Sequence, residues 1–74
     1  MTCTATHENG TTWRFAVAVN AKRGNDHVRY QHANAARNYC QKNRIPGRVT
    51  IIDEGSGDTY IAVVGWDYTL KIEG

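Results

Sequence analysis

The stretch ANAARNYCQKNRIPGRVTIIDE, residues 33–54, passes from a helical pattern to a strand pattern. Its first half predicts a helix over residues 33–43, because small residues recur at helical spacing with polar residues between them. The small residues on its expected buried face are Ala33, Ala36 and Cys40. Pro46 ends the helix, and the Val/Ile-rich run after it predicts a strand over residues 48–54. One helix with a predicted hairpin before it and another after it indicates an α+β fold.

Strands on both sides of this stretch complete a predicted antiparallel sheet. Residues 12–20 place large apolar side chains such as Trp13 at every second position, which is the period of a half-buried strand. Further strands are expected at residues 27–30 and 59–68, and residues 2–7 and 69–74 are candidates for short edge strands, with a hairpin turn at Asn9-Gly10. We expect a single antiparallel sheet of about four strands in ββαββ order, with one α-helix packed on one face.

Length and composition favour one small domain, residues 1–74, that works by binding. A chain of 74 residues buries only about 60% of its unfolded surface, which leaves a thin core and little room for a deep pocket. Hydrophobic residues make up 41% and charged residues 22%, as in ordinary globular proteins. No apolar run approaches the ~20 residues of a membrane span, and the start has no apolar stretch for a signal peptide. We therefore expect a soluble, cytoplasmic protein.

No catalytic, metal or cofactor site is predicted. Asp53 and Glu54 are adjacent on a strand and so point to opposite faces, which is poor geometry for paired acid–base catalysis. The Gly55-Ser56-Gly57 run fits a hairpin loop better than a nucleophile elbow, because a strand follows it. The cysteines and histidines, scattered without the spacing of a zinc site, are Cys3, His7, His27, His32 and Cys40. We expect two reduced thiols, with a single disulfide between them as the alternative.

Charge is segregated along the chain. Residues 22–48 contain seven basic residues and one acidic residue, a net charge of +6, whereas residues 49–74 contain one basic and five acidic residues, a net charge of −4. Such segregation steers association with a partner of opposite charge. The predicted basic surface consists of Lys22, Arg23, Arg29, Arg37, Gln41 and Arg44. It suits an acidic protein surface or a phosphate backbone, and a merely solvated helix face is the simpler alternative.

Aromatic residues near the last long strand form a second candidate interface. The residues concerned are Tyr60, Trp66 and Tyr68, all at even positions of residues 59–68. Ile61 and Val63 occupy the opposite face, and one short helix cannot cover both faces. Either the sheet bends around a core or an aromatic patch stays exposed, where Trp and Tyr side chains dominate binding hot spots. The alternative is that Trp66 completes the core together with Trp13.

The layout from about residue 13 to residue 68 resembles small phage-encoded inhibitors of host machinery. These include anti-CRISPR proteins that target the multisubunit surveillance complex and phage inhibitors of bacterial RNA polymerase. The matching features are size and element order: a Trp/Phe/Val strand, an arginine-bearing hairpin, an Ala-rich helix, a Gly-Arg-Val strand and an aromatic strand. The resemblance is architectural, includes no signature motif and transfers no functional residue. It implies a non-enzymatic viral protein that docks on a host nucleoprotein complex in the host cytoplasm.

Such an inhibitor, blocking nucleic-acid binding or a conformational step of its target, is the leading hypothesis from the sequence. The acidic C-terminal half, with Asp53, Glu54, Asp58 and Asp67, would then meet lysines that normally hold DNA. The alternative is a small nucleic-acid-binding domain that uses the basic residues 22–48 and whose affinity falls steeply with salt. A module that self-associates through an edge strand is the third hypothesis.

Overall fold

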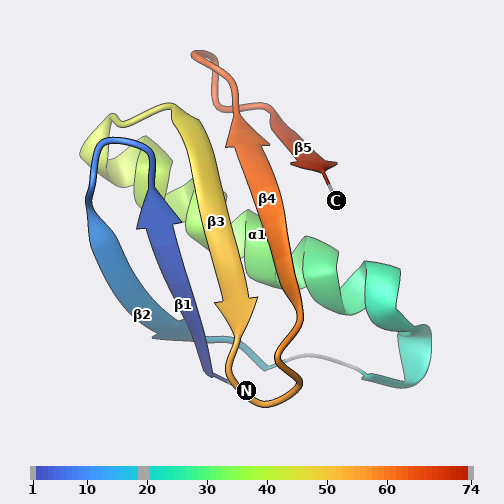
Figure 1. Cartoon of the computed structure of the whole chain (residues 1–74). Coiled ribbons are helices and arrows are strands. Elements are labelled where there is room, and N and C mark those ends of the chain that lie inside the picture. Colours follow the sequence, from blue (N-terminus) through green and yellow to red (C-terminus); the bar gives the residue numbers. More distant parts are fainter. Residues whose placement is uncertain (1, 19–20, 74) are drawn as a thin grey trace.

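The computed structural model describes residues 2–18 and 21–73. Its elements in chain order are β1 (Thr2–His7), β2 (Thr12–Ala16), the 3-10 helix η1 (Ala21–Arg23), α1 (Asn25–Asn43), β3 (Gly47–Asp53), β4 (Thr59–Val64) and β5 (Leu70–Glu73). Figure 1 shows two layers, a sheet with α1 running diagonally across one of its faces. The predicted α+β class with one α-helix on an antiparallel sheet is confirmed, but the sheet described has five strands in ββαβββ order.

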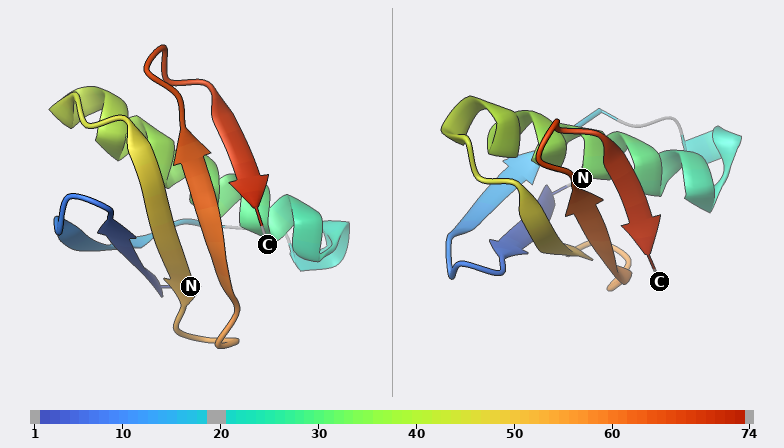
Figure 2. Two further views of the ribbon diagram at one scale, coloured as in Figure 1. Left: turned by 45° about the horizontal axis from the view of Figure 1, so that its top comes forward. Right: turned by 90° about the horizontal axis from the view of Figure 1, so that it is seen from above.

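The strands pair in the order β2-β1-β3-β4-β5, and every pairing is antiparallel. The predicted Asn9-Gly10 turn joins β1 to β2, with Gly10 at a φ of 94° and the Asn9 side chain accepting the N–H of Thr11. The chain then crosses through α1 and returns as β3 on the other side of β1. Figure 2 shows that α1 covers one side of the sheet and leaves the other side without a helix.

The helix α1 begins at Asn25, eight residues earlier than Ala33, where the sequence predicts its start. The predicted strand over residues 27–30 is therefore wrong, because these residues form the first turns of α1. Four alternating residues are too few to distinguish a period of two from a helical period. Gly24 precedes the helix without a side-chain cap, so no capping residue marks the start in the sequence. No helix in the described residues has the length and apolarity that crossing a bilayer requires.

The core lies between α1 and the sheet and consists mainly of small side chains. Residues with no exposed surface are Cys3, Ala5, Ala33, Ala36, Cys40, Val49, Ile51 and Ala62. The three helix residues predicted to face the sheet are among them, and small side chains allow α1 to pack close to the strands. Larger groups close the core beside β2, where the Trp13 ring stacks on Tyr39 of α1 with centroids 3.9 Å apart. Both cysteines are free and buried, so the alternative of a disulfide is not realised.

Two strands are shorter than the sequence predicts. β2 ends at Ala16 although its apolar alternation continues, and residues 19 and 20 of the predicted strand lie outside the described residues. β4 ends at Val64, because Gly65 opens a loop that closes through its N–H to the Thr69 carbonyl. Residues 70–73 then pair with β4 as the separate edge strand β5, which agrees with the short edge strand expected within residues 69–74.

The sheet face opposite α1 carries both polar and apolar side chains. The outward residues of β1, Thr2, Thr4 and Thr6, alternate with buried residues on the helix side. Ion pairs span this face, from Arg14 to Glu54 at 3.0 Å and from Arg48 to Glu73 at 2.9 Å. Exposed ion pairs of this kind contribute at most about 1 kcal/mol to the free energy of unfolding. These ion pairs therefore add little to the stability of the domain. Most of the stabilising burial of apolar side chains lies on the side of the sheet that faces α1.

Candidate binding surface and a buried polar cluster

The loop between β4 and β5, residues 65–69, presents an exposed tryptophan. Trp66 is 85% exposed, more than any other large hydrophobic side chain in the described residues. Hydrogen bonds within the loop fix its shape. The Gly65 N–H donates to the Thr69 carbonyl, which closes the loop that carries Trp66. The Asp67 carboxylate accepts both the hydroxyl and the backbone N–H of Thr69, and these bonds lower the pKa of Asp67. The tryptophan is thus displayed on an organised turn.

Arg37 connects α1 to this loop. Its Nη1 donates to the Tyr68 carbonyl at 3.2 Å and to Oε1 of Gln41 at 3.1 Å. The side-chain oxygens of Asn34 and Asn38 accept from the same guanidinium. The C-terminal half of α1 and the β4–β5 loop lie toward the same end of the molecule (Figure 1). We call the predicted binding residues at this end the helix–loop surface: Arg37, Gln41, Arg44, Trp66 and Tyr68. Of these, Tyr68 is partly buried against the core.

Two members of the helix–loop surface have a left-handed backbone. Arg44 has a φ of 57° and Tyr68 a φ of 66°, and they are the only non-glycine residues of the described chain with positive φ. Arg44 follows α1 at the position where glycine is usual, and its N–H donates to the carbonyl of Gln41. This conformation costs an L-residue roughly 1–2 kcal/mol. Backbone strain of this kind gathers at functional sites.

The structure does not bring the other predicted basic residues onto this surface. Lys22 and Arg23 lie in η1, at the opposite end of α1 from Arg44. The 19 residues of α1 span about 28 Å, so the two groups are far apart. Arg29, between them, forms a two-pronged ion pair with Asp58 at 2.6 and 2.8 Å. The basic stretch of the sequence is therefore divided into separate groups.

Tyr60 is a core residue and does not belong to an exposed aromatic patch, so its predicted place on a binding surface is wrong. Its side chain points from β4 toward α1 and is only 3% exposed. Its hydroxyl donates to the Arg29 carbonyl at 3.2 Å, and the Arg29 guanidinium lies 4.9 Å from the ring centroid. The longer α1 covers the inward side of β4, whereas Trp66 lies beyond the end of that strand.

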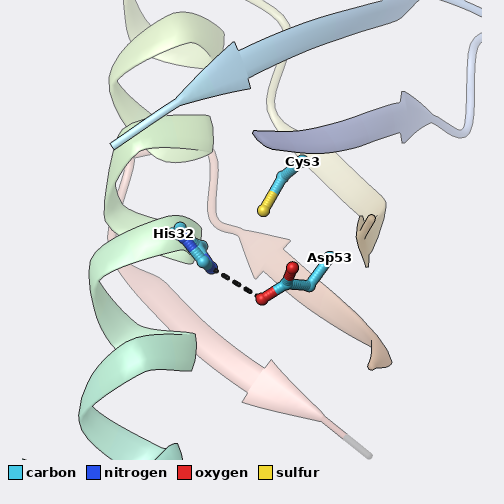
Figure 3. A group of neighbouring side chains, drawn as sticks. All are labelled: Cys3, His32 and Asp53. Atoms are coloured by element: carbon cyan, nitrogen blue, oxygen red, sulfur yellow. Dashed lines mark ion pairs between the residues drawn. The ribbon is translucent and has the colours of Figure 1, made fainter. Parts of the chain in front are cut away.

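A buried cluster of Cys3, His32 and Asp53 lies near the opposite end of the molecule. Figure 3 shows their side chains converging from β1, α1 and β3. They are 0%, 1% and 3% exposed, and the sulfur, one ring nitrogen and one carboxylate oxygen all lie within 4.8 Å of one another. His32 Nδ1 is 3.9 Å from Asp53 Oδ2, which is too long for a hydrogen bond. Both ring nitrogens of His32 are buried and have no hydrogen-bond partner among the described residues.

Burial sets the charge state of this cluster. Burial, helped by the nearby Asp53 carboxylate, raises the pKa of the Cys3 thiol to about 11. Burial also lowers the pKa of His32, and Asp53 opposes that change only in part. Asp53 Oδ1 accepts the backbone N–H groups of Gly55 and Ser56 at 2.9 and 3.4 Å, which leaves Oδ2 directed at His32. The imidazole is thus neutral, and one carboxylate oxygen is held toward it.

Cysteine, histidine and aspartate occur together both in nucleophilic catalytic sites and in metal sites. The geometry of this cluster favours metal binding. A thiol with a pKa of about 11 is protonated near neutral pH, and it has no exposed surface through which a substrate could reach it. A thiolate, a neutral imidazole and a carboxylate are ordinary ligands of divalent transition metals.

The sequence patterns do not predict this cluster, because its members come from three distant elements. Cys3 and His32 stand among scattered candidate ligands, and Asp53 is paired in the sequence only with Glu54. A weak signal does exist, since Asp53 occupies an inward position on the same side of β3 as Ile51. A polar residue at a core position needs a partner.

No protein-family model, curated protein or solved structure compared with the chain matches it significantly. The function is therefore inferred from the geometry described above.

Proposed function

We propose that this protein is a non-enzymatic binding protein that docks on a macromolecular partner through the helix–loop surface. The observation that carries the proposal is Trp66, a tryptophan 85% exposed on a hydrogen-bonded loop. Tryptophan and arginine are the residues most enriched at binding hot spots, and both stand on this surface. A tryptophan held on an organised loop loses little conformational entropy on binding.

Backbone strain at Arg44 and Tyr68 supports the same surface. Glycine would adopt the left-handed conformation at position 44 more readily than arginine, so the arginine costs stability. An arginine at such a position supplies a charge at the end of α1, next to the turn that carries Gln41. This combination of cost and placement is typical of a residue used in binding.

The partner that fits this surface best is a protein with an acidic rim and an apolar pocket. Arg37 in α1 and Arg44 at its C-terminal end supply the positive charge of this surface, and Asp67 is the acidic residue in the β4–β5 loop. Rim charges of this kind steer association, while a central aromatic side chain supplies most of the affinity. A nucleic acid is less favoured, because phosphate recognition needs a continuous track of cations and the basic residues are divided along α1.

The architecture suggests a specific form of this activity. In size and in its strand–helix–strand layout the chain resembles phage-encoded inhibitors such as anti-CRISPR proteins, although η1 and the start of α1 replace the arginine-bearing hairpin expected from the sequence. Such a protein would act stoichiometrically on a host nucleoprotein complex. By occupying one face of that complex, it would block nucleic-acid binding or activation. A domain of this size with a buried thiol and an outward aromatic anchor suits blocking better than turnover.

An affinity pull-down from bacterial lysate, run with and without nuclease, tests the proposal. We expect one defined protein complex that survives nuclease treatment and whose recovery depends only weakly on salt. Nuclease-sensitive recovery of many nucleic-acid-associated proteins, with a steep loss at higher salt, would favour a nucleic-acid-binding domain instead. The charge reversal Arg23→Glu is a matched control, because Arg23 is exposed but lies at the far end of α1.

A further inference from the structure

We propose that Cys3, His32 and Asp53 bind one zinc ion, a role separate from docking through the helix–loop surface. The ligands would be the Cys3 sulfur, one ring nitrogen of His32 and one carboxylate oxygen of Asp53, and the three side chains converge from three different elements (Figure 3). Zinc accepts this mixture of sulfur, nitrogen and oxygen ligands, commonly from three protein groups with a water molecule as the fourth ligand.

The unpartnered imidazole is the strongest reason for the proposal. His32 is 1% exposed, and within the part of the chain that the structure describes neither ring nitrogen has a hydrogen-bond partner. A buried polar atom left without a partner costs roughly 1–3 kcal/mol. A metal ion at the centre of the cluster would coordinate one of these nitrogens and so remove the cost of leaving that nitrogen without a partner. A direct hydrogen bond to Asp53 is the competing arrangement, but the 3.9 Å separation exceeds its length.

The spacing of the three ligand atoms is close to that of a zinc site. Ligand atoms on a tetrahedral zinc ion are roughly 3.3–3.6 Å apart, as follows from bond lengths of about 2.0–2.3 Å. Here the atoms lie within 4.8 Å of one another, and His32 Nδ1 is 3.9 Å from Asp53 Oδ2. Binding of zinc would draw the three ligand atoms roughly 1 Å closer together.

Charge and hydrogen bonding also fit a divalent cation. On binding, the Cys3 thiol would release its proton to solvent, and the thiolate and the Asp53 carboxylate would together neutralise Zn²⁺. The Asp53 carboxylate is already oriented, because its Oδ1 accepts the N–H groups of Gly55 and Ser56. Such outer hydrogen bonds position metal-binding carboxylates and raise metal affinity.

A route for the fourth ligand exists beside Asp53. A surface pocket of about 340 Å³ reaches Asp53, and it is lined by Val28 and Arg29, which precede His32 by one helical turn. Asn25, Ser56, Gly57 and Asp58 complete its lining. Cys3 and His32 do not line this pocket, so a water molecule or a zinc ion would reach them past Asp53.

Metal titration of the untagged, full-length chain tests the site. After treatment with a chelator, we expect one equivalent of Zn²⁺ to bind with a Kd at or below about 1 µM, measured by competition with a chromophoric chelator. Co²⁺ should produce a thiolate charge-transfer band, which Cys3→Ser abolishes and Cys40→Ser retains. Cys40 is the matched control, since it is an equally buried free thiol outside the cluster.

A second variant keeps the test decisive if Cys3→Ser does not fold. Asp53→Asn preserves an oxygen for the turn N–H groups but replaces the ligand oxygen with an NH₂ group. Zinc should raise the Tm of the wild-type chain, while Asp53→Asn should show no rise and at least a tenfold loss of affinity. Absence of stoichiometric zinc binding, or a cobalt band that depends on Cys40, would overturn the proposal. Neither result affects docking, because the helix–loop surface shares no residue with the cluster.

Discussion

Replacing Arg44 with glycine should stabilise the protein while weakening its binding to the partner. Arg44 has a φ of 57° and a ψ of 47°, a left-handed conformation that costs an L-residue roughly 1–2 kcal/mol. Glycine avoids this cost but loses about 0.5–1 kcal/mol through the greater freedom of its unfolded chain. The net gain in the free energy of unfolding is therefore about 1 kcal/mol, and each kcal/mol raises the Tm of a domain of this size by about 4–8 °C.

Thermal unfolding followed by circular dichroism measures this gain. The matched control is Lys42→Gly, an exposed position still inside α1, where glycine should lower stability by about 1 kcal/mol. Binding of Arg44→Gly to the partner should weaken, because its guanidinium is lost while the helix end is preserved. A Tm at or below that of the wild type would contradict the strain argument, and unchanged affinity would remove Arg44 from the interface.

Three further predictions concern the core and its edge. Tyr60→Phe should lower the free energy of unfolding by about 1 kcal/mol in denaturant titrations, because it removes the hydroxyl bond to the Arg29 carbonyl; an unchanged midpoint would contradict this. The ion pair with Arg29 lowers the pKa of Asp58, so its stabilisation should be present at neutral pH and fade as pH falls through the folded-state pKa, below the usual Asp range. The stability difference between wild type and Asp58→Asn should therefore shrink on acidification, and a difference independent of pH would count against the pair. Finally, Cys3 and Cys40 should resist thiol reagents until the chain unfolds, because both are buried with raised pKa values; rapid labelling of the native protein would refute their burial.

The α+β class follows from local patterns, whereas element boundaries depend on tertiary contacts. The alternation around Trp13, the helical spacing of Ala33, Ala36 and Cys40, and the stop at Pro46 each have a local physical cause. The early start of α1 has no such local mark, because Gly24 provides no side-chain cap. Its first turns contact the start of β4, where the Tyr60 hydroxyl donates to the Arg29 carbonyl, and a short sequence window does not contain this contact.

The candidate sites divide in the same way. Trp66, Arg37 and Tyr68 are predicted as binding residues, and Arg37 donates to the backbone carbonyl of Tyr68 in the loop that carries Trp66. Tyr60 is predicted with them, but it is buried. The alternation of side chains along a strand separates two faces and does not reveal which of them a helix covers. The His32 cluster depends on three elements meeting in space, so residue spacing along the chain could not predict it.

The most direct test of the central claim compares the affinity of three variants for the partner recovered from lysate. Titration calorimetry would measure wild type, Trp66→Ala and the control Arg23→Glu, each first shown to be folded by circular dichroism. If the helix–loop surface is the docking site, Trp66→Ala should weaken binding at least about 30-fold, the effect of losing a hot spot worth 2 kcal/mol or more. Arg23→Glu should change it less than threefold. Equal affinity for wild type and Trp66→Ala, or a larger loss in Arg23→Glu, would contradict docking through this surface.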